Sequence, residues 1–220
     1  MRTARIYLSI LALLVAAGAG CSSTYYEALE KLGYAKRDLL VERVKKTEEA
    51  QNDAKEQFKS ALDHFLSVTK VNGGELERKY NELSGEMQRS QERAEEVRDR
   101  IAAVRDVADA LFSEWQAELG QYSNSDLRAQ SERELDMTKA RYENLVRLME
   151  RSADRMDPVL ATFRDQVLFL KHNLNARALA SLDTTDRDLR GDIDRLIADM
   201  EASIRESQAF IQGIQPQPKP

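Results

Sequence analysis

Residues 76–115, LERKYNELSGEMQRSQERAEEVRDRIAAVRDVADALFSEW, decide the fold of this chain. Apolar and small residues recur there at alternating steps of four and three, a 3.5-residue repeat sustained over more than five heptads. Such a repeat is typical of a coiled-coil seam. The positions between are mainly charged or polar, so we expect them to face water. The seam comprises Leu76, Tyr80, Leu83, Met87, Ser90, Ala94, Val97, Ile101, Val104, Ala108, Leu111 and Trp115.

A matching but weaker stripe precedes this segment, between residues 26 and 68. The two are joined by residues 71–74, VNGG, where a glycine can supply the left-handed residue that ends a helix. We therefore predict a long antiparallel coiled-coil hairpin that places Phe58 opposite Leu83 or Met87. The stripe comprises Tyr26, Gly33, Arg37, Leu40, Val44, Thr47, Gln51, Ala54, Phe58, Ala61, Phe65 and Val68.

Two polar residues, Thr47 and Gln51, interrupt the apolar pattern of the first stripe. Polar seam residues cost stability but can fix the register of a coiled coil. Equally, this part of the helix could pack loosely or meet other helices. The weaker stripe also leaves open whether the seam closes within one chain or between two.

The rest of the chain is predicted to form a smaller bundle of about three helices that packs on the hairpin. After a break at residues 120–125, Asn124 or Ser125 would cap the next helix. The dipeptide Asp157-Pro158 predicts a break there, or a kink in one helix. Residues 184–186, TTD, predict another turn and cap. The run at 167–170, VLFL, is apolar on all faces, which predicts a helix surrounded by the others.

The predicted organisation has four parts. Residues 1–20 form a signal peptide and residues 21–121 a lipidated N-terminus with the hairpin. Residues 122–214 form the bundle segment. Residues 215–220, QPQPKP, form a disordered tail because proline prevents a helix.

Composition excludes several classes of protein. The 220 residues include only 9 Gly and 4 Pro, too few turn formers for an all-β sandwich or barrel, so we expect an all-α fold. A single Cys excludes an intrachain disulfide and a cysteine-based metal site. The formal net charge of −5 argues against a nucleic-acid partner, which would need a dominant basic face.

The first 21 residues have the pattern of a secretory signal. Arg2 and Arg5 precede an apolar run over residues 6–17, which is shorter than the roughly 20 residues of a membrane-spanning helix. Small residues then lead to Cys21. This arrangement resembles a bacterial lipobox, although Gly18 stands where a lipobox usually has Leu or another aliphatic residue.

We expect Cys21 to become the acylated first residue, anchored by chains such as palmitate, because an unpaired Cys in a secreted protein is unusual. Ser22 in place of Asp resembles the pattern that sorts lipoproteins to the outer membrane. The alternatives are a signal cleaved without lipid and an uncleaved anchor.

The stretch 163–176, FRDQVLFLKHNLNA, resembles the signature block of a bacterial family described as domain of unknown function 2959. The break at residues 122–124, YSN, and the start at residues 21–26, CSSTYY, are also similar to that family. The resemblance spans nearly the whole mature chain. It implies a helical, envelope-located protein and transfers no catalytic or binding residue.

No catalytic motif is present: the chain lacks a glycine-rich phosphate loop, a Gly-x-Ser-x-Gly elbow and a His-Glu-x-x-His pair. Four polar residues, Asp165, Lys171, His172 and Asn173, lie close together on the predicted central helix. They could form a small polar site. The interpretation we favour is that Asp165 and His172 hydrogen-bond to other helices and satisfy their own burial.

Other chemistry-bearing residues have structural interpretations. We expect His64 at the boundary between core and surface, and Trp115 in the core. The arginines Arg93, Arg98, Arg100 and Arg105 have acidic residues at neighbouring helical spacings, which predicts surface salt bridges.

Together these patterns predict a lipid-anchored, periplasm-facing protein that acts as an envelope scaffold, spacer or accessory interaction subunit. A long hairpin buries little volume for its length, which suits reach and partner contact better than an enzyme core. The alternative is a bundle that binds a small ligand or peptide. We expect no enzymatic activity, no cofactor and no metal. The expected partners are the membrane, through the N-terminal lipid, and an envelope protein, with a homo-oligomer if the seam closes between chains.

Overall fold

The computed structural model describes residues 35–68, 76–173 and 176–214. Within these ranges the chain is all-α, as predicted, and contains no strand. The elements are α3 (Lys36–Val68), α4 (Leu76–Glu118), the short 3-10 helix η2 (Leu119–Gln121), α5 (Ser125–His172) and α6 (Ala176–Ile214). The predicted signal peptide, Cys21, the glycine turn at 71–74 and the tail at 215–220 lie outside the described residues.

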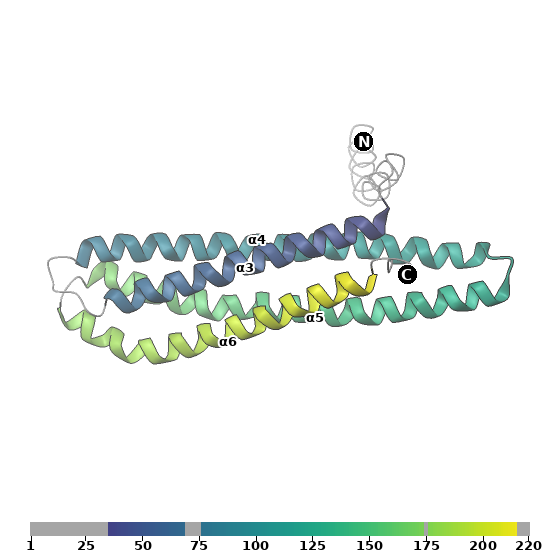
Figure 1. Ribbon diagram of the computed structural model, residues 1–220. Helices are drawn as coiled ribbons and strands as arrows, with labels where there is room; N and C mark the ends of the chain where they lie inside the picture. Colours follow the sequence, from purple (N-terminus) through teal and green to yellow (C-terminus); the bar gives the residue numbers. More distant parts are fainter. Residues whose placement is uncertain (1–34, 69–75, 174–175, 215–220) are drawn as a thin grey trace, which may run out of the picture.

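The four long helices form an elongated bundle (Figure 1). Helix α3 packs against α4 and α6, and α5 packs against the same two helices, so the four form a ring. Successive helices run in opposite directions, the up-down-up-down order that short connections favour. The longest helix, α5, has 48 residues and is about 72 Å long at 1.5 Å per residue. One apolar core runs through the bundle.

The heptad stripe of α4 faces this core over its whole length. Every position is buried except Tyr80, Met87 and Trp115, which are partly buried and pack against the core. The weaker stripe of α3 is also buried from Leu40 to Phe65, whereas Arg37 is exposed. The period of the sequence pattern therefore identifies the buried faces of both helices.

Helices α3 and α4 have the antiparallel arrangement that the sequence predicts. At one end of α3, Lys36 Nζ lies 2.9 Å from Glu114 Oε1. Near the other end, Lys79 Nζ donates a hydrogen bond to Ser67 Oγ at 3.2 Å. Between them, Gln57 Nε2 donates to Glu86 Oε2 at 2.6 Å. The placement of Phe58 opposite Leu83 or Met87 stays a prediction.

The predicted number of helices after the hairpin is wrong, because there are two in the described part of the chain rather than about three. Helix α5 runs through Asp157-Pro158 without a break. Pro158 is exposed, so water can satisfy the Asp154 carbonyl that loses its helical partner. Helix α6 likewise runs through residues 184–186. Each Thr or Asp costs at most about 0.7 kcal/mol of helix propensity, too little to end a long helix.

The prediction that the 167–170 helix is surrounded by others is also wrong. Phe163, Val167 and Leu170 are buried, as expected for one face of α5. Leu168 and Phe169, however, are 49% and 39% exposed. In a ring of four helices each helix has two neighbours, so an apolar residue on the outer face has nothing to pack against.

Candidate functional site

The four polar residues near the end of α5 are placed at the surface. Asp165, Lys171 and His172 are exposed, so the expectation that His172 is buried is wrong. Asn173 follows the helix, where its backbone N–H donates to the Leu170 carbonyl at 3.2 Å and its Nδ2 donates to the Phe169 carbonyl at 3.0 Å. These bonds end the helix, and the hypothesis of a small polar site at these four residues stays a prediction.

The arginine run forms surface salt bridges, as expected. Arg93 lies 2.8 Å from Glu96, Arg98 pairs with Asp157, and Arg105 lies 2.6 Å from Glu150. The last two pairs join α4 to α5. These arginines therefore connect helices or neighbouring turns.

His64 has a charged partner that the sequence alone did not reveal. Its Nε2 lies 3.2 Å from Oε1 of Glu86, a carboxylate that is only 6% exposed. Arg89 contacts the same oxygen at 2.7 Å, and Gln57 donates to the other. Burial alone would raise the pKa of Glu86. Hydrogen bonds from Arg89 and Gln57, with the charges of Arg89 and His64, outweigh this effect and lower the pKa below its ordinary value.

A buried polar layer crosses the middle of the bundle. Gln51 on α3 donates from Nε2 to Ser152 Oγ on α5 at 2.8 Å, and accepts at Oε1 from Ser203 Oγ on α6 at 3.0 Å. The three side chains are completely buried. This layer explains why the α3 seam is polar there: Gln51 meets other helices, one of the interpretations that the sequence left open. Its hydrogen bonds are made within the layer, so it presents no free group to a ligand.

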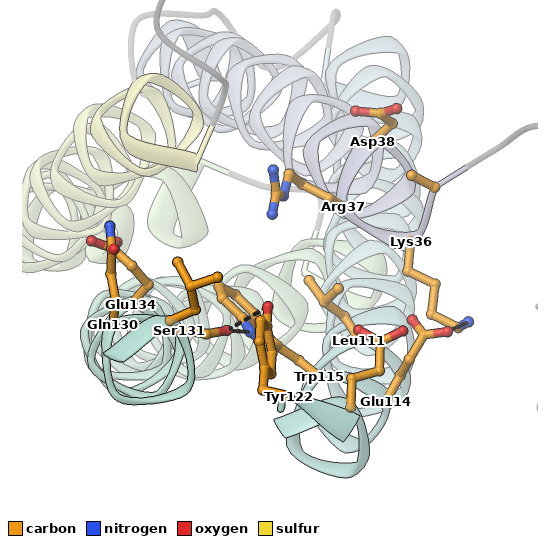
Figure 2. Close-up of a pocket in the computed structure, with 13 residues that line it drawn as sticks. Lys36, Arg37, Asp38, Leu111, Glu114, Trp115, Tyr122, Gln130, Ser131 and Glu134 are labelled. Carbon is orange, nitrogen blue, oxygen red and sulfur yellow. Dashed lines mark hydrogen bonds and ion pairs between the residues drawn. The ribbon is translucent and has the colours of Figure 1, made fainter. Parts of the chain in front are cut away.

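The strongest candidate for a binding site is a groove at one end of the bundle. Helices α4 and α5 extend beyond the first residue of α3 and the last residue of α6 (Figure 1). Among the described residues, a groove of about 740 Å³ lies on the inner side of this extension. We call it the open-end groove. Its lining includes Leu127 and, labelled in Figure 2, Arg37, Leu111, Trp115, Tyr122 and Glu134.

One wall of the open-end groove is held by hydrogen bonds among α4, the connection after η2 and α5. Asn124, one of the two caps that the sequence predicts, caps α5 and accepts from the backbone N–H groups of Asp126 and Leu127. Trp115 Nε1 donates to Ser131 Oγ at 2.8 Å, and the Tyr122 hydroxyl lies 3.4 Å from the same oxygen. These bonds fix the positions of both aromatic rings.

The open-end groove combines apolar surface with charges at its rim. Tyr122 and Leu127 are 43% and 54% exposed, whereas Leu111 is buried. The Arg37 guanidinium points into the opening, 6.0 Å from the centre of the Trp115 ring, within reach of a cation–π interaction (Figure 2). Lys36 and Glu114 pair with each other at the rim. Such a surface suits an amphipathic segment better than a small ion.

Sequence reasoning did not find the open-end groove. Trp115 was expected in the core, yet its indole is partly exposed at the point where α3 begins. Its lining comes from residues far apart in the sequence, such as Arg37 on α3, Trp115 on α4 and Leu127 on α5, and no local pattern brings them together. The part of the predicted stripe upstream of Lys36 lies outside the described residues.

Two further observations bear on the kind of protein. In the described ranges, no group of three or more His, Cys, Asp or Glu residues is arranged to hold a metal ion. No described helix contains a stretch that is both long and apolar enough to span a bilayer.

Comparison with known proteins gives one family match. The family described as "Protein of unknown function (DUF2959)" matches residues 25–214, which include all four long helices and the open-end groove. No curated protein and no solved structure matches the chain.

Proposed function

The chain belongs to the DUF2959 family, and we propose that it is a lipid-anchored, periplasm-facing lipoprotein that serves as a scaffold, spacer or accessory interaction subunit of the bacterial envelope. The observation that carries this proposal is the shape of the molecule. Four helices of 33 to 48 residues pack along their length around one continuous core. The longest spans about 72 Å, so the bundle can hold a partner well away from the point where the chain is anchored.

The proposed anchor rests on the sequence. Arg2 and Arg5, the apolar run at residues 6–17 and the small residues before Cys21 support a lipoprotein signal. Thirteen residues, 22–34, separate Cys21 from the described part of the chain. The start of α3 lies at the end of the bundle that carries the open-end groove. This end would therefore lie nearer the membrane, and the end with Leu168 and Phe169 would lie farther from it.

Photo-crosslinking in living cells tests the scaffold proposal. A photoreactive amino acid replaces Phe169, an exposed apolar residue at the far end, and, in a separate variant, the exposed Arg164 five residues earlier on α5. We expect one defined protein partner in the envelope fraction from at least one of these positions. The absence of a defined partner from both positions, and from a third probe at Met137, would count against a scaffold.

The second candidate is a module that binds a small ligand or a peptide, and the open-end groove favours it. At about 740 Å³ it lies in the range of roughly 300–1,000 Å³ that is common for ligand sites. Native mass spectrometry of the protein released gently from membranes tests this candidate. A non-covalently bound species that is lost after Leu127→Glu would support it, and protein that carries no non-covalently bound species would argue against it. We propose no enzymatic activity for either candidate.

A further inference from the structure

The open-end groove lies where the α3–α4 register continues past the start of α3. Along the hairpin, positions nearer the N-terminus of α3 lie beside positions nearer the C-terminus of α4: Asp53 contacts Arg93 at 3.5 Å, and Lys36 contacts Glu114 at 2.9 Å. The next residues of α4 on this side, Trp115 and Glu118, line the open-end groove. Residues that precede Lys36 would face them if the same register continued.

The segment before α3 has the composition that this position requires. Residues 25–34 read YYEALEKLGY, with Tyr, Ala and Leu at six of the ten positions. Tyr25, Leu29 and Leu32 recur at the spacing of one helical face. The charged residues of the segment, Glu27, Glu30 and Lys31, fall outside that set. Its last residue is bonded to Ala35, which itself lines the groove.

We propose that residues 25–32 bind in the open-end groove of the same chain. The face with Tyr25, Leu29 and Leu32 covers Trp115, Tyr122 and Leu127 and removes their exposed apolar surface from water, which favours binding. Because the segment is joined directly to the rim, its effective concentration at the groove exceeds that of a separate peptide. Binding would also hold residue 25 close to the bundle. This inference does not depend on lipidation of Cys21.

The single tryptophan of the chain, Trp115, reports on the groove. The full-length protein is reconstituted in phosphatidylcholine vesicles, and the fluorescence emission maximum of Trp115 and its quenching by acrylamide are measured. In Leu29→Glu/Leu32→Glu we expect the emission to shift to longer wavelength and the quenching to increase. Lys31→Glu makes the same change of two charge units away from the apolar face, and we expect it to leave both readings unchanged. Equal readings for the native protein and Leu29→Glu/Leu32→Glu would overturn the proposal.

A second measurement remains decisive if the double glutamate variant fails to fold. With Cys21 replaced by Ser, we expect mild oxidation of Leu29→Cys/Leu127→Cys to form a disulfide within one chain, whereas Lys31→Cys/Leu127→Cys should crosslink much less. A disulfide that joins two chains and depends on protein concentration would assign the groove to the segment of a second copy and overturn the proposal. Failure of Leu29→Cys/Leu127→Cys to crosslink at all would also overturn it. The disulfide test can fail while photo-crosslinking finds an envelope partner, and the reverse, so this proposal and the scaffold proposal are tested separately.

Discussion

Gln51 on α3 and Ser152 on α5 form a hydrogen bond of 2.8 Å in the completely buried interior of the bundle, 101 positions apart in the sequence. Ser203 on α6 donates to the same glutamine side chain. A polar side chain in an apolar core is tolerated when its hydrogen bonds are made. Since Gln51 contacts two helices besides its own, this layer also favours one relative position of α3, α5 and α6 over others.

Removal of the Gln51 side chain should destabilise the bundle. Gln51→Ala takes away the acceptor of Ser203 and leaves a cavity, so we expect a loss of about 1–3 kcal/mol in the free energy of unfolding. Urea denaturation followed by circular dichroism measures this loss. Gln88→Ala is the matched control, because Gln88 is exposed on α4 and its loss should stay within about 0.5 kcal/mol. Equal losses in the free energy of unfolding for Gln51→Ala and Gln88→Ala would contradict the presence of the buried polar layer.

Two phenylalanines on α5 should differ sharply in their contribution to stability. Phe163 is 1% exposed and its ring centre lies 5.8 Å from that of Phe65, whereas Phe169 is 39% exposed. We expect Phe163→Ala to cost about 3–5 kcal/mol and Phe169→Ala to change stability little. Thermal melts of the two variants measure the loss of stability. A larger loss from Phe169→Ala than from Phe163→Ala would contradict the assignment of the buried face of α5.

The sequence predicts the buried faces of α3 and α4 well because a heptad repeat places apolar or small residues on the same face of the helix at successive turns. Thus Leu83, Val97 and Val104 are all buried as expected. The predicted break at Pro158 and the predicted turn at residues 184–186 are wrong, because local signals for a break are worth a few kcal/mol at most and packing along helices of 48 and 39 residues outweighs them. The partner of Gln51 and the open-end groove depend on contacts between distant segments, which no local pattern contains.

The carboxylate of Glu86 should make stability depend on pH. Its pKa is lowered in the folded protein from an ordinary value of 4.5. The stabilisation by the Glu86 carboxylate is therefore complete above the pKa that this group has in the unfolded chain. It is lost as the pH falls through the lower pKa that the group has in the folded protein. We expect Glu86→Gln to lower the melting temperature at pH 7, and the difference from the native protein to shrink as the pH falls below about 4.5. Glu77→Gln, at an exposed position of the same helix, is the control. If the difference in melting temperature between the native protein and Glu86→Gln grew toward acid pH, the predicted direction of the pKa shift would be wrong.

Pro158 offers a test of the continuous helix α5. Inside a helix, proline removes one backbone hydrogen bond and is about 3 kcal/mol less favourable than alanine. Since proline also restricts the unfolded chain, we expect Pro158→Ala to stabilise the protein by about 1–3 kcal/mol in urea denaturation. If Pro158 instead began a new helix, where proline fits well, the same change would be neutral or destabilising.

The mass of the mature N-terminus tests most directly the central claim, that this elongated bundle is held to the membrane by lipid. Protein extracted from membranes with detergent is digested, and the N-terminal peptide is identified by mass spectrometry. We predict that Cys21 is the first residue and carries two or three acyl chains. An unmodified Cys21, or a mature chain that starts at any other residue, would contradict the account.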